Sequence, residues 1–124
     1  MGLKAVGLKG IVAAFLALAL AGCASLVTGG PLVRQGEPTG VLRFINASRA
    51  PVTTIMISDC SASTYGLNRL PQGVAVPPGR AYDFTVSAGC WDIAAGYMTG
   101  TSSWDEARGR LQVAPGRITE WGVR

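Results

Sequence analysis

Few side chains in this sequence could do chemistry, and one important kind is missing. The 124 residues include three cysteines and seven carboxylates but no histidine. Histidine is the usual general base near neutral pH and the commonest metal ligand in proteins. Ser102 and Ser103 therefore have no histidine to activate them as nucleophiles. We predict a protein without catalytic residues, cofactors or a metal site, and so not an enzyme.

Two pairs of carboxylates are the remaining candidates. Asp83 and Asp92 fall on neighbouring predicted strands, and such a pair can act as acid and base when its pKa values are driven apart. Both lie opposite the apolar positions of their strands, which favours solvated side chains or acceptors in turns. Asp105 and Glu106 could contact a cation, but two carboxylates fall short of the roughly six to eight oxygens that Ca²⁺ takes.

The first 22 residues have the three zones of a secretory signal peptide. Lys4 and Lys9 make the start basic, and residues 11–20 form an unbroken apolar run. As a helix this run would be about 15 Å long, which is half of the bilayer's hydrocarbon core. A cleaved signal is therefore favoured over a short membrane anchor or a buried helix.

The signal ends in Leu20-Ala21-Gly22-Cys23, which resembles the lipobox of bacterial lipoproteins. The resemblance implies that the chain is cleaved before Cys23 and that the Cys23 sulfur carries a diacylglyceryl group, with acyl chains such as palmitate. It also implies that the new amino terminus is acylated. Two or more acyl chains would attach the protein stably to a membrane. An ordinary secretory signal with an incidental cysteine is the alternative. By resemblance to the lipoprotein sorting rule, Ala24 and Ser25 lack the aspartate of inner-membrane retention, which implies the outer membrane, facing the periplasm.

The segment that would follow cleavage, residues 23–40, is rich in glycine and proline and is predicted to be an acylated flexible tether. Both lysines leave with the signal, so the basic residues that remain are all arginines. They are scattered along the chain and form no run, although the net charge of the whole sequence is +4. This pattern indicates a solvated surface and no nucleic-acid partner.

From residue 41 onward, short runs of alternating apolar and polar residues predict β-strands. The predicted strands are 41–47, 52–58, a short one near 67–70 or 74–76, 81–87, 90–98, 109–113 and 117–123. Pro77-Pro78-Gly79 and Pro115-Gly116 favour turns between them. Residues 41–124 are therefore predicted to be one all-β domain, a small antiparallel two-sheet sandwich of six to seven strands.

The alternation also predicts the core and one turn. The apolar positions expected to be buried are Leu42, Phe44, Ile55, Ile57, Tyr82, Phe84, Val86, Trp91, Ile93, Leu111, Val113, Ile118 and Trp121. Asn46-Ala47-Ser48 fits a glycosylation sequon, but in a bacterial exported protein we interpret it as a turn in which the Asn46 side chain bonds nearby backbone.

If Cys23 is acylated, Cys60 and Cys90 remain, and export favours an oxidising compartment. We predict that they form a disulfide joining two strand ends. Closing a loop of about 30 residues would contribute on the order of 3 to 4 kcal/mol in the chain-entropy model. Two buried free thiols are the alternative.

The predicted domain also resembles small secreted bacterial β-sandwich modules over about residues 41–95. The matching pieces are Phe44-Ile45-Asn46-Ala47-Ser48, Ile55-Met56-Ile57-Ser58, Tyr65-Gly66-Leu67-Asn68-Arg69-Leu70, Pro77-Pro78-Gly79 and Cys90-Trp91-Asp92-Ile93. Tyr65 stands where tryptophan is more usual in those modules. The resemblance implies an immunoglobulin-like topology and no assigned chemistry.

These observations predict a lipid-anchored envelope protein that serves as a non-catalytic binding or structural accessory module. Its partners would be the membrane, through Cys23, and an envelope protein or peptidoglycan. Trp104 lies in a Gly/Ser/Thr-rich stretch outside the strand pattern, so it and Tyr65 are candidate binding residues, although Trp104 could instead close one end of the sandwich. The alternative function is a periplasmic inhibitor that inserts the predicted loop 99–108 into a hydrolase.

Overall fold

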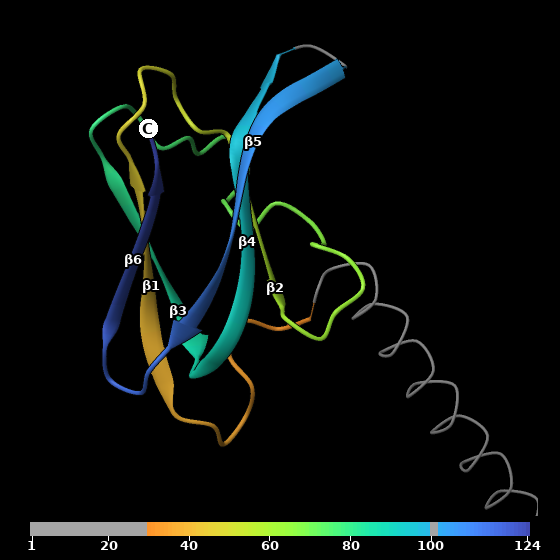
Figure 1. Cartoon of the computed structure of the whole chain (residues 1–124), viewed down its shortest axis with the longest axis vertical. Helices are drawn as coiled ribbons and strands as arrows, with labels where there is room; N and C mark the ends of the chain where they lie inside the picture. The colour runs from red at the N-terminus through yellow and green to blue at the C-terminus, as the bar shows by residue number, and fades with distance from the viewer. Residues whose placement is uncertain (1–29, 100–101) are drawn as a thin grey trace, which may run out of the picture.

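The computed structural model describes residues 30–99 and 102–124, with only the backbone described at 98–99 and 102–106. The described chain is all-β, and its strands form two packed three-stranded sheets (Figure 1). The strands are β1 (Thr39–Asn46), β2 (Thr54–Asp59), β3 (Ala81–Ser87), β4 (Gly89–Thr99), β5 (Ser102–Val113) and β6 (Ile118–Val123). The predicted signal peptide, with its lipobox and Cys23, lies outside the described residues.

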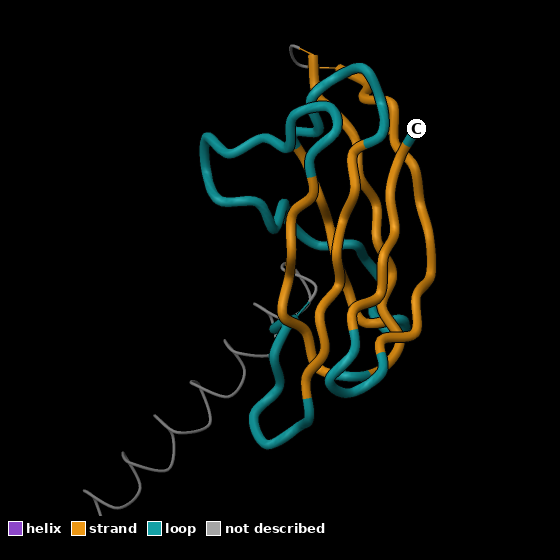
Figure 2. Tube along the Cα trace, turned by 90° about the vertical axis from the view of Figure 1, so that its left-hand side faces the viewer, coloured by secondary structure: helices purple, strands orange, loops and turns teal. Residues whose placement is uncertain are grey.

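One sheet has the order β3-β1-β6 and the other β2-β4-β5. All neighbouring strands are antiparallel except β1 and β6, which are parallel, so the prediction of a wholly antiparallel sandwich is wrong. The turn between β5 and β6 carries the chain from one sheet to the other. Strand β6 therefore runs opposite to β5 and in the same direction as β1. Figure 2 shows the strands side by side along the long axis, with most of the loops at the two ends.

The largest differences from the predicted strands are in residues 67–76 and at the start of β5. Neither 67–70 nor 74–76 forms a strand; each supplies one isolated bridge, Asn68 to Met56 and Val76 to Val52. Strand β5 begins at Ser102, seven residues before the predicted start at Gly109. Its first half has few large apolar residues, but pairing with β4 continues there by backbone hydrogen bonds, which do not depend on an apolar pattern.

The inner positions of both sheets form one hydrophobic core. The largest fully buried apolar side chains are Trp91, Phe44, Leu42, Ile55, Ile57, Ile93, Val76, Val86 and Val113. Tyr82, Leu111 and Trp121 are partly buried and pack against this core. Ile118 is 53% exposed, so its predicted burial is wrong. Side chains alternate between the faces of a strand, and Ile118 and Trp121 are an odd number of residues apart, so they cannot both point inward.

The outer edge of β2 is covered by residues of the predicted strand 67–70. The Asn68 side chain accepts a hydrogen bond from the Ile55 amide at 2.9 Å and donates one to the Thr53 carbonyl at 3.0 Å. The Arg69 guanidinium donates to the Ile57 carbonyl at 2.9 and 3.1 Å. Side chains thus occupy backbone groups that an edge strand would otherwise present to another chain.

Gly109 lets the two sheets approach where β5 faces β6. A Cβ built at Gly109 would lie 2.5 Å from Nε1 of Trp121. We expect Gly109→Ala to push the indole outward and to lower the free energy of unfolding by about 1–3 kcal/mol. Tryptophan fluorescence should shift to the red in the folded variant, whereas Gln112→Ala, on an exposed position of the same strand, should leave it unchanged. An unshifted spectrum with unchanged stability in Gly109→Ala would contradict this packing.

Candidate functional site

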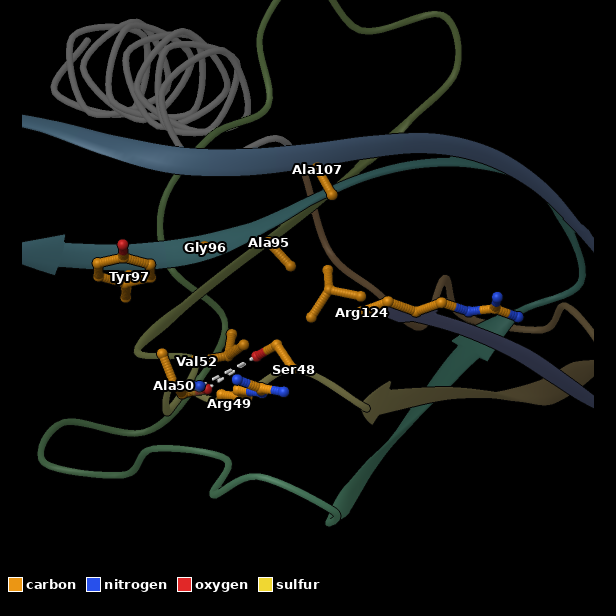
Figure 3. A pocket seen from close by; sticks show the side chains of 10 residues that line it. Ser48, Arg49, Ala50, Val52, Ala95, Gly96, Tyr97, Ala107 and Arg124 are labelled. Carbon is orange, nitrogen blue, oxygen red and sulfur yellow. Dashed lines mark hydrogen bonds between the residues drawn. The ribbon is translucent and has the colours of Figure 1, made fainter.

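A cleft of about 350 Å³ opens at the end of the sandwich where β1 and β6 finish (Figure 3). Segment 48–52 and β6 form one side, and the middle of the β4–β5 hairpin forms the other (Figure 3). The lining residues are Ser48, Arg49, Ala50, Val52, Ala95, Gly96, Tyr97, Ala107, Val123 and Arg124. Most of them are apolar, as in small-ligand sites, where a few polar groups then set the orientation of a ligand.

The cleft exists because inward side chains become smaller along the β4–β5 hairpin. The register pairs Trp91 with Leu111 near the far end and Ala95 with Ala107 at the cleft. Two methyl groups replace an indole and an isobutyl group, so the space between the sheets is not filled there. Val52, which is 3% exposed, closes the bottom of the cleft toward the core.

A buried asparagine fixes the turn that forms one wall of the cleft. Asn46 is fully buried, and its Nδ2 donates to the carbonyl oxygens of Ala50 and Val76, each at 2.8 Å. Its Oδ1 accepts from the amide and the hydroxyl of Ser48, at 3.0 and 2.6 Å. The predicted turn around Asn46 is therefore confirmed. Every hydrogen-bonding group of this side chain is used inside the protein, so the fold leaves none of them for a glycan.

Two arginines flank the cleft, and their environment differs from that of the paired arginines elsewhere. Arg34, Arg43 and Arg110 each have a carboxylate within ion-pair distance. Arg49 and Arg124 have no ion pair with any residue of the described part of the chain. Arg49 lies along the rim made by 48–50, whereas the Arg124 guanidinium points outward (Figure 3). Arg49 thus places on one side of the cleft a guanidinium that has no ion pair within the described part of the chain.

Asp83 and Asp92 are not brought together, so the prediction that they lie on neighbouring strands is wrong. Asp83 is on β3 and Asp92 on β4, and these strands belong to different sheets, because the chain crosses between the sheets at Ala88. Asp83 accepts two hydrogen bonds from Arg43, at 2.8 and 3.0 Å, and Asp92 accepts two from Arg110, at 2.8 and 3.1 Å. Each carboxylate is neutralised by an arginine and does not face the other.

These contacts give the protein a defined acid response. Hydrogen bonds from Arg43 hold the pKa of Asp83 below its usual value, and hydrogen bonds from Ser61, with help from Arg34, do the same for Asp59. Because the folded-state pKa is the lower one, this stabilisation is present above the unfolded value of about 3.9 and is lost as pH falls through the folded pKa.

We therefore expect the urea midpoint to fall as the pH is lowered from about 5 to about 2, in the range where these carboxylates take up protons. Asp83→Asn should weaken the dependence of the urea midpoint on pH and should cost little stability at low pH. A midpoint that is unchanged across this range would contradict the assignment.

The described chain begins at Gly30 beside β2, where the Gly30 carbonyl accepts a hydrogen bond from Arg69 at 2.6 Å. Its 34–38 segment lies at the end of the sandwich opposite the cleft (Figure 1). Leu32 and Pro38 accept hydrogen bonds from the amides of Ser87 and Ala88, both at 2.8 Å. Arg34 stacks over the Trp91 ring, 5.0 Å from its centroid, and donates to Asp59 at 2.9 Å. Half of the predicted tether 23–40 therefore lies against the domain, and β1 already begins at Thr39.

Cys60 and Cys90 form a disulfide at the same end, as predicted. Cys60 directly follows β2 and Cys90 is the second residue of β4, so the bond joins neighbouring strands of one sheet. Their Cα atoms are 5.5 Å apart, and the Cys60 amide donates to the Cys90 carbonyl at 3.3 Å. The bond also holds the start of the long 60–80 connection against the sheet.

The other predicted site residues are dispersed. Trp104 lies within β5 and not in a loop, so the predicted loop 99–108 is wrong; β4 and β5 continue almost to their connecting turn. The side chains of Ser102, Ser103, Trp104, Asp105 and Glu106 are outside the described structure. Tyr65 is half-buried in the 60–80 connection, with the Arg108 guanidinium 5.2 Å from its ring centroid. No group of three or more potential metal-ligating side chains occurs among the residues the structure describes.

Four residues that line the cleft were not among the predicted site residues: Arg49, Ala95, Tyr97 and Ala107. A signal was present, because the inward residues shrink from Trp91 to Ala95 along one strand of the hairpin. This decrease in side-chain size indicates a cleft only when the pairing register of β4 and β5 is known.

In comparisons with known proteins, no family model, no curated protein and no solved structure matches this chain.

Proposed function

We propose that this protein is a lipid-anchored envelope lipoprotein that acts as a non-catalytic binding module, with the cleft as its binding site. The observation that carries the proposal is the position of the cleft at the end of the sandwich opposite the 34–38 segment. Trp91, under Arg34, and Tyr97, at the cleft, are about 20 Å apart at the rise of an extended strand. An anchor at Cys23 would reach the domain through Gly30, beside β2, and would leave the lining of the cleft free.

The length of the link limits the distance between the domain and the membrane. Residues 23–29 would span at most about 25 Å when fully extended. The domain would therefore stay close to the lipid surface. We place it on the periplasmic side of the outer membrane because of the residues that follow Cys23.

An immunoglobulin-like relationship remains part of the proposal at the level of two packed sheets. The disulfide differs from that of antibody domains, because it joins neighbouring strands of one sheet and does not bridge the two sheets.

The anchor is tested by replacing Cys23 with serine in the full-length protein. We expect labelled fatty acid to be absent from Cys23→Ser and the protein to leave the membrane fraction, while Ser25→Ala behaves like the original. Unchanged fractionation of Cys23→Ser would refute the anchor.

The binding role is tested by placing a photo-crosslinking amino acid at Ala50, on the cleft, and at Thr85, on the exposed face of β3. Crosslinks to one defined envelope component, protein or peptidoglycan, should form from position 50 and not from position 85. Equal yields from both positions would show that the cleft has no special role.

A hydrolase inhibitor is the second candidate, and the β4–β5 hairpin favours it. The last β4 residue paired with β2 is Gly96, but β4 and β5 remain paired as far as Thr99 and Ser102 (Figure 1). The hairpin therefore extends past its sheet, as an inserting element must. This candidate predicts one stoichiometric hydrolase partner that is lost when residues 98–103 are removed.

A further inference from the structure

We propose that the cleft binds the carboxyl-terminal residue of a peptide, with a small apolar side chain inside and the terminal carboxylate beside Arg49. This inference rests on the proposed function and names the class of ligand.

The space available in the cleft limits the size of the apolar group that a ligand can place there. Its volume of about 350 Å³ is near the lower end for small-molecule sites. Below Val52 the space between the sheets is filled by core side chains, including Ile55, Ile93 and Phe44, all fully buried. A long acyl chain would need a channel in that position. The methyl groups of Ala50, Ala95 and Ala107 instead line a space that admits a short apolar side chain and the backbone next to it.

The charge at the cleft indicates which polar group the ligand carries. Arg49 is exposed and has no carboxylate partner in the described part of the chain, whereas Arg34, Arg43 and Arg110 are paired. A guanidinium pairs with a carboxylate through charge-assisted hydrogen bonds, which are stronger than neutral ones. Capture of a terminal carboxylate is also a recurring mode of peptide recognition. An apolar cavity beside one free guanidinium therefore complements a carboxylate attached to a short apolar group.

Other parts of the molecule offer less. A second hollow of about 290 Å³, lined by Ile45, Gly122 and neighbouring residues of β6, includes the Glu120 carboxylate, which would repel an anion. The row Glu120, Arg43 and Asp83 across the outer face of the first sheet is already internally paired.

The test is isothermal titration calorimetry of the full-length protein in detergent with N-acetyl-Ala-Ala, either as the free acid or as its carboxamide. We expect the acid to bind at least about tenfold more tightly than the amide, the difference between a charge-assisted contact and a neutral one. Arg49→Gln should weaken binding of the acid about tenfold and leave binding of the amide unchanged. Arg117→Gln removes an equal charge at the other end of the sandwich and should change neither.

The cavity is tested separately by Ala107→Leu, which fills the cleft from a half-buried position of β5. Binding of both peptides should be lost, with thermal unfolding of the variant used to show that it is folded. Should this prove unfolded, Ala50→Leu fills the cleft from the opposite wall. Equal affinities for acid and amide, full binding to Arg49→Gln, or no binding of the acid would each overturn the inference. If crosslinking from position 50 persists while the acid does not bind, the ligand class is wrong and the binding function stands.

Discussion

Asn46→Ala is expected to lower the free energy of unfolding by about 3–5 kcal/mol, because the loss of each buried hydrogen-bond partner costs about 1–3 kcal/mol. The carbonyl oxygens of Ala50 and Val76 lose their donor, and the Ser48 amide loses its acceptor. With its amide nitrogen and its amide oxygen, this side chain ties the end of β1 to the turn through residue 50 and to the 76–80 connection. Such a loss is a large share of the stability of a small domain.

Urea unfolding followed by circular dichroism measures this effect. Two further variants separate its causes. Asn46→Asp keeps the acceptor but removes the donor and buries a carboxylate, so it should also be strongly destabilising. Ser48→Ala removes one hydroxyl from the rim of the same turn and should cost about 1 kcal/mol. A change of less than about 1 kcal/mol in Asn46→Ala would mean that water replaces these bonds.

Removal of the disulfide is the second large effect. We expect Cys60→Ala/Cys90→Ala to lose about 3–4 kcal/mol, since the bond closes a loop with a sequence separation of 30 and so restricts the unfolded chain. The folded structure should change little, because β2 and β4 are paired up to Asp59 and Trp91 without the bond. The measurement is again urea unfolding.

The control for this experiment is reduction. A reducing agent should lower the free energy of unfolding of the original protein by the same amount as the double substitution does. It should leave the free energy of unfolding of the double variant unchanged. If both proteins shift equally under reduction, the stabilisation does not come from this bond. Two alkylatable thiols in the native, oxidised protein would rule out the disulfide itself.

The strands and the core could be predicted because they depend on local alternation. Leu42 and Phe44 on β1, and Trp91 and Ile93 on β4, follow the period of two that a half-buried strand requires, and all four are fully buried. The disulfide could be predicted from the number of cysteines and the predicted export. Counted from Trp121, the alternation of β6 places Ile118 on the outer face, so its predicted burial was wrong.

The cleft could not be predicted, because it depends on which residues face one another across the sandwich. Ala95 and Ala107 are unremarkable in the sequence, and they create a hollow only when the β4–β5 register pairs them and β6 ends beside them. The uncompensated charge of Arg49 likewise depends on where the carboxylates lie after folding.

By itself the sequence determined the all-β class, most strand positions, the pairing of Cys60 with Cys90 and the turn at Asn46, since each follows from neighbouring residues or from a count. Tertiary structure alone decided the parallel placement of β6 beside β1, the separation of Asp83 from Asp92 and the cleft. The physical reason is that side-chain alternation specifies which face of a strand is buried. It does not specify which strand becomes the neighbour.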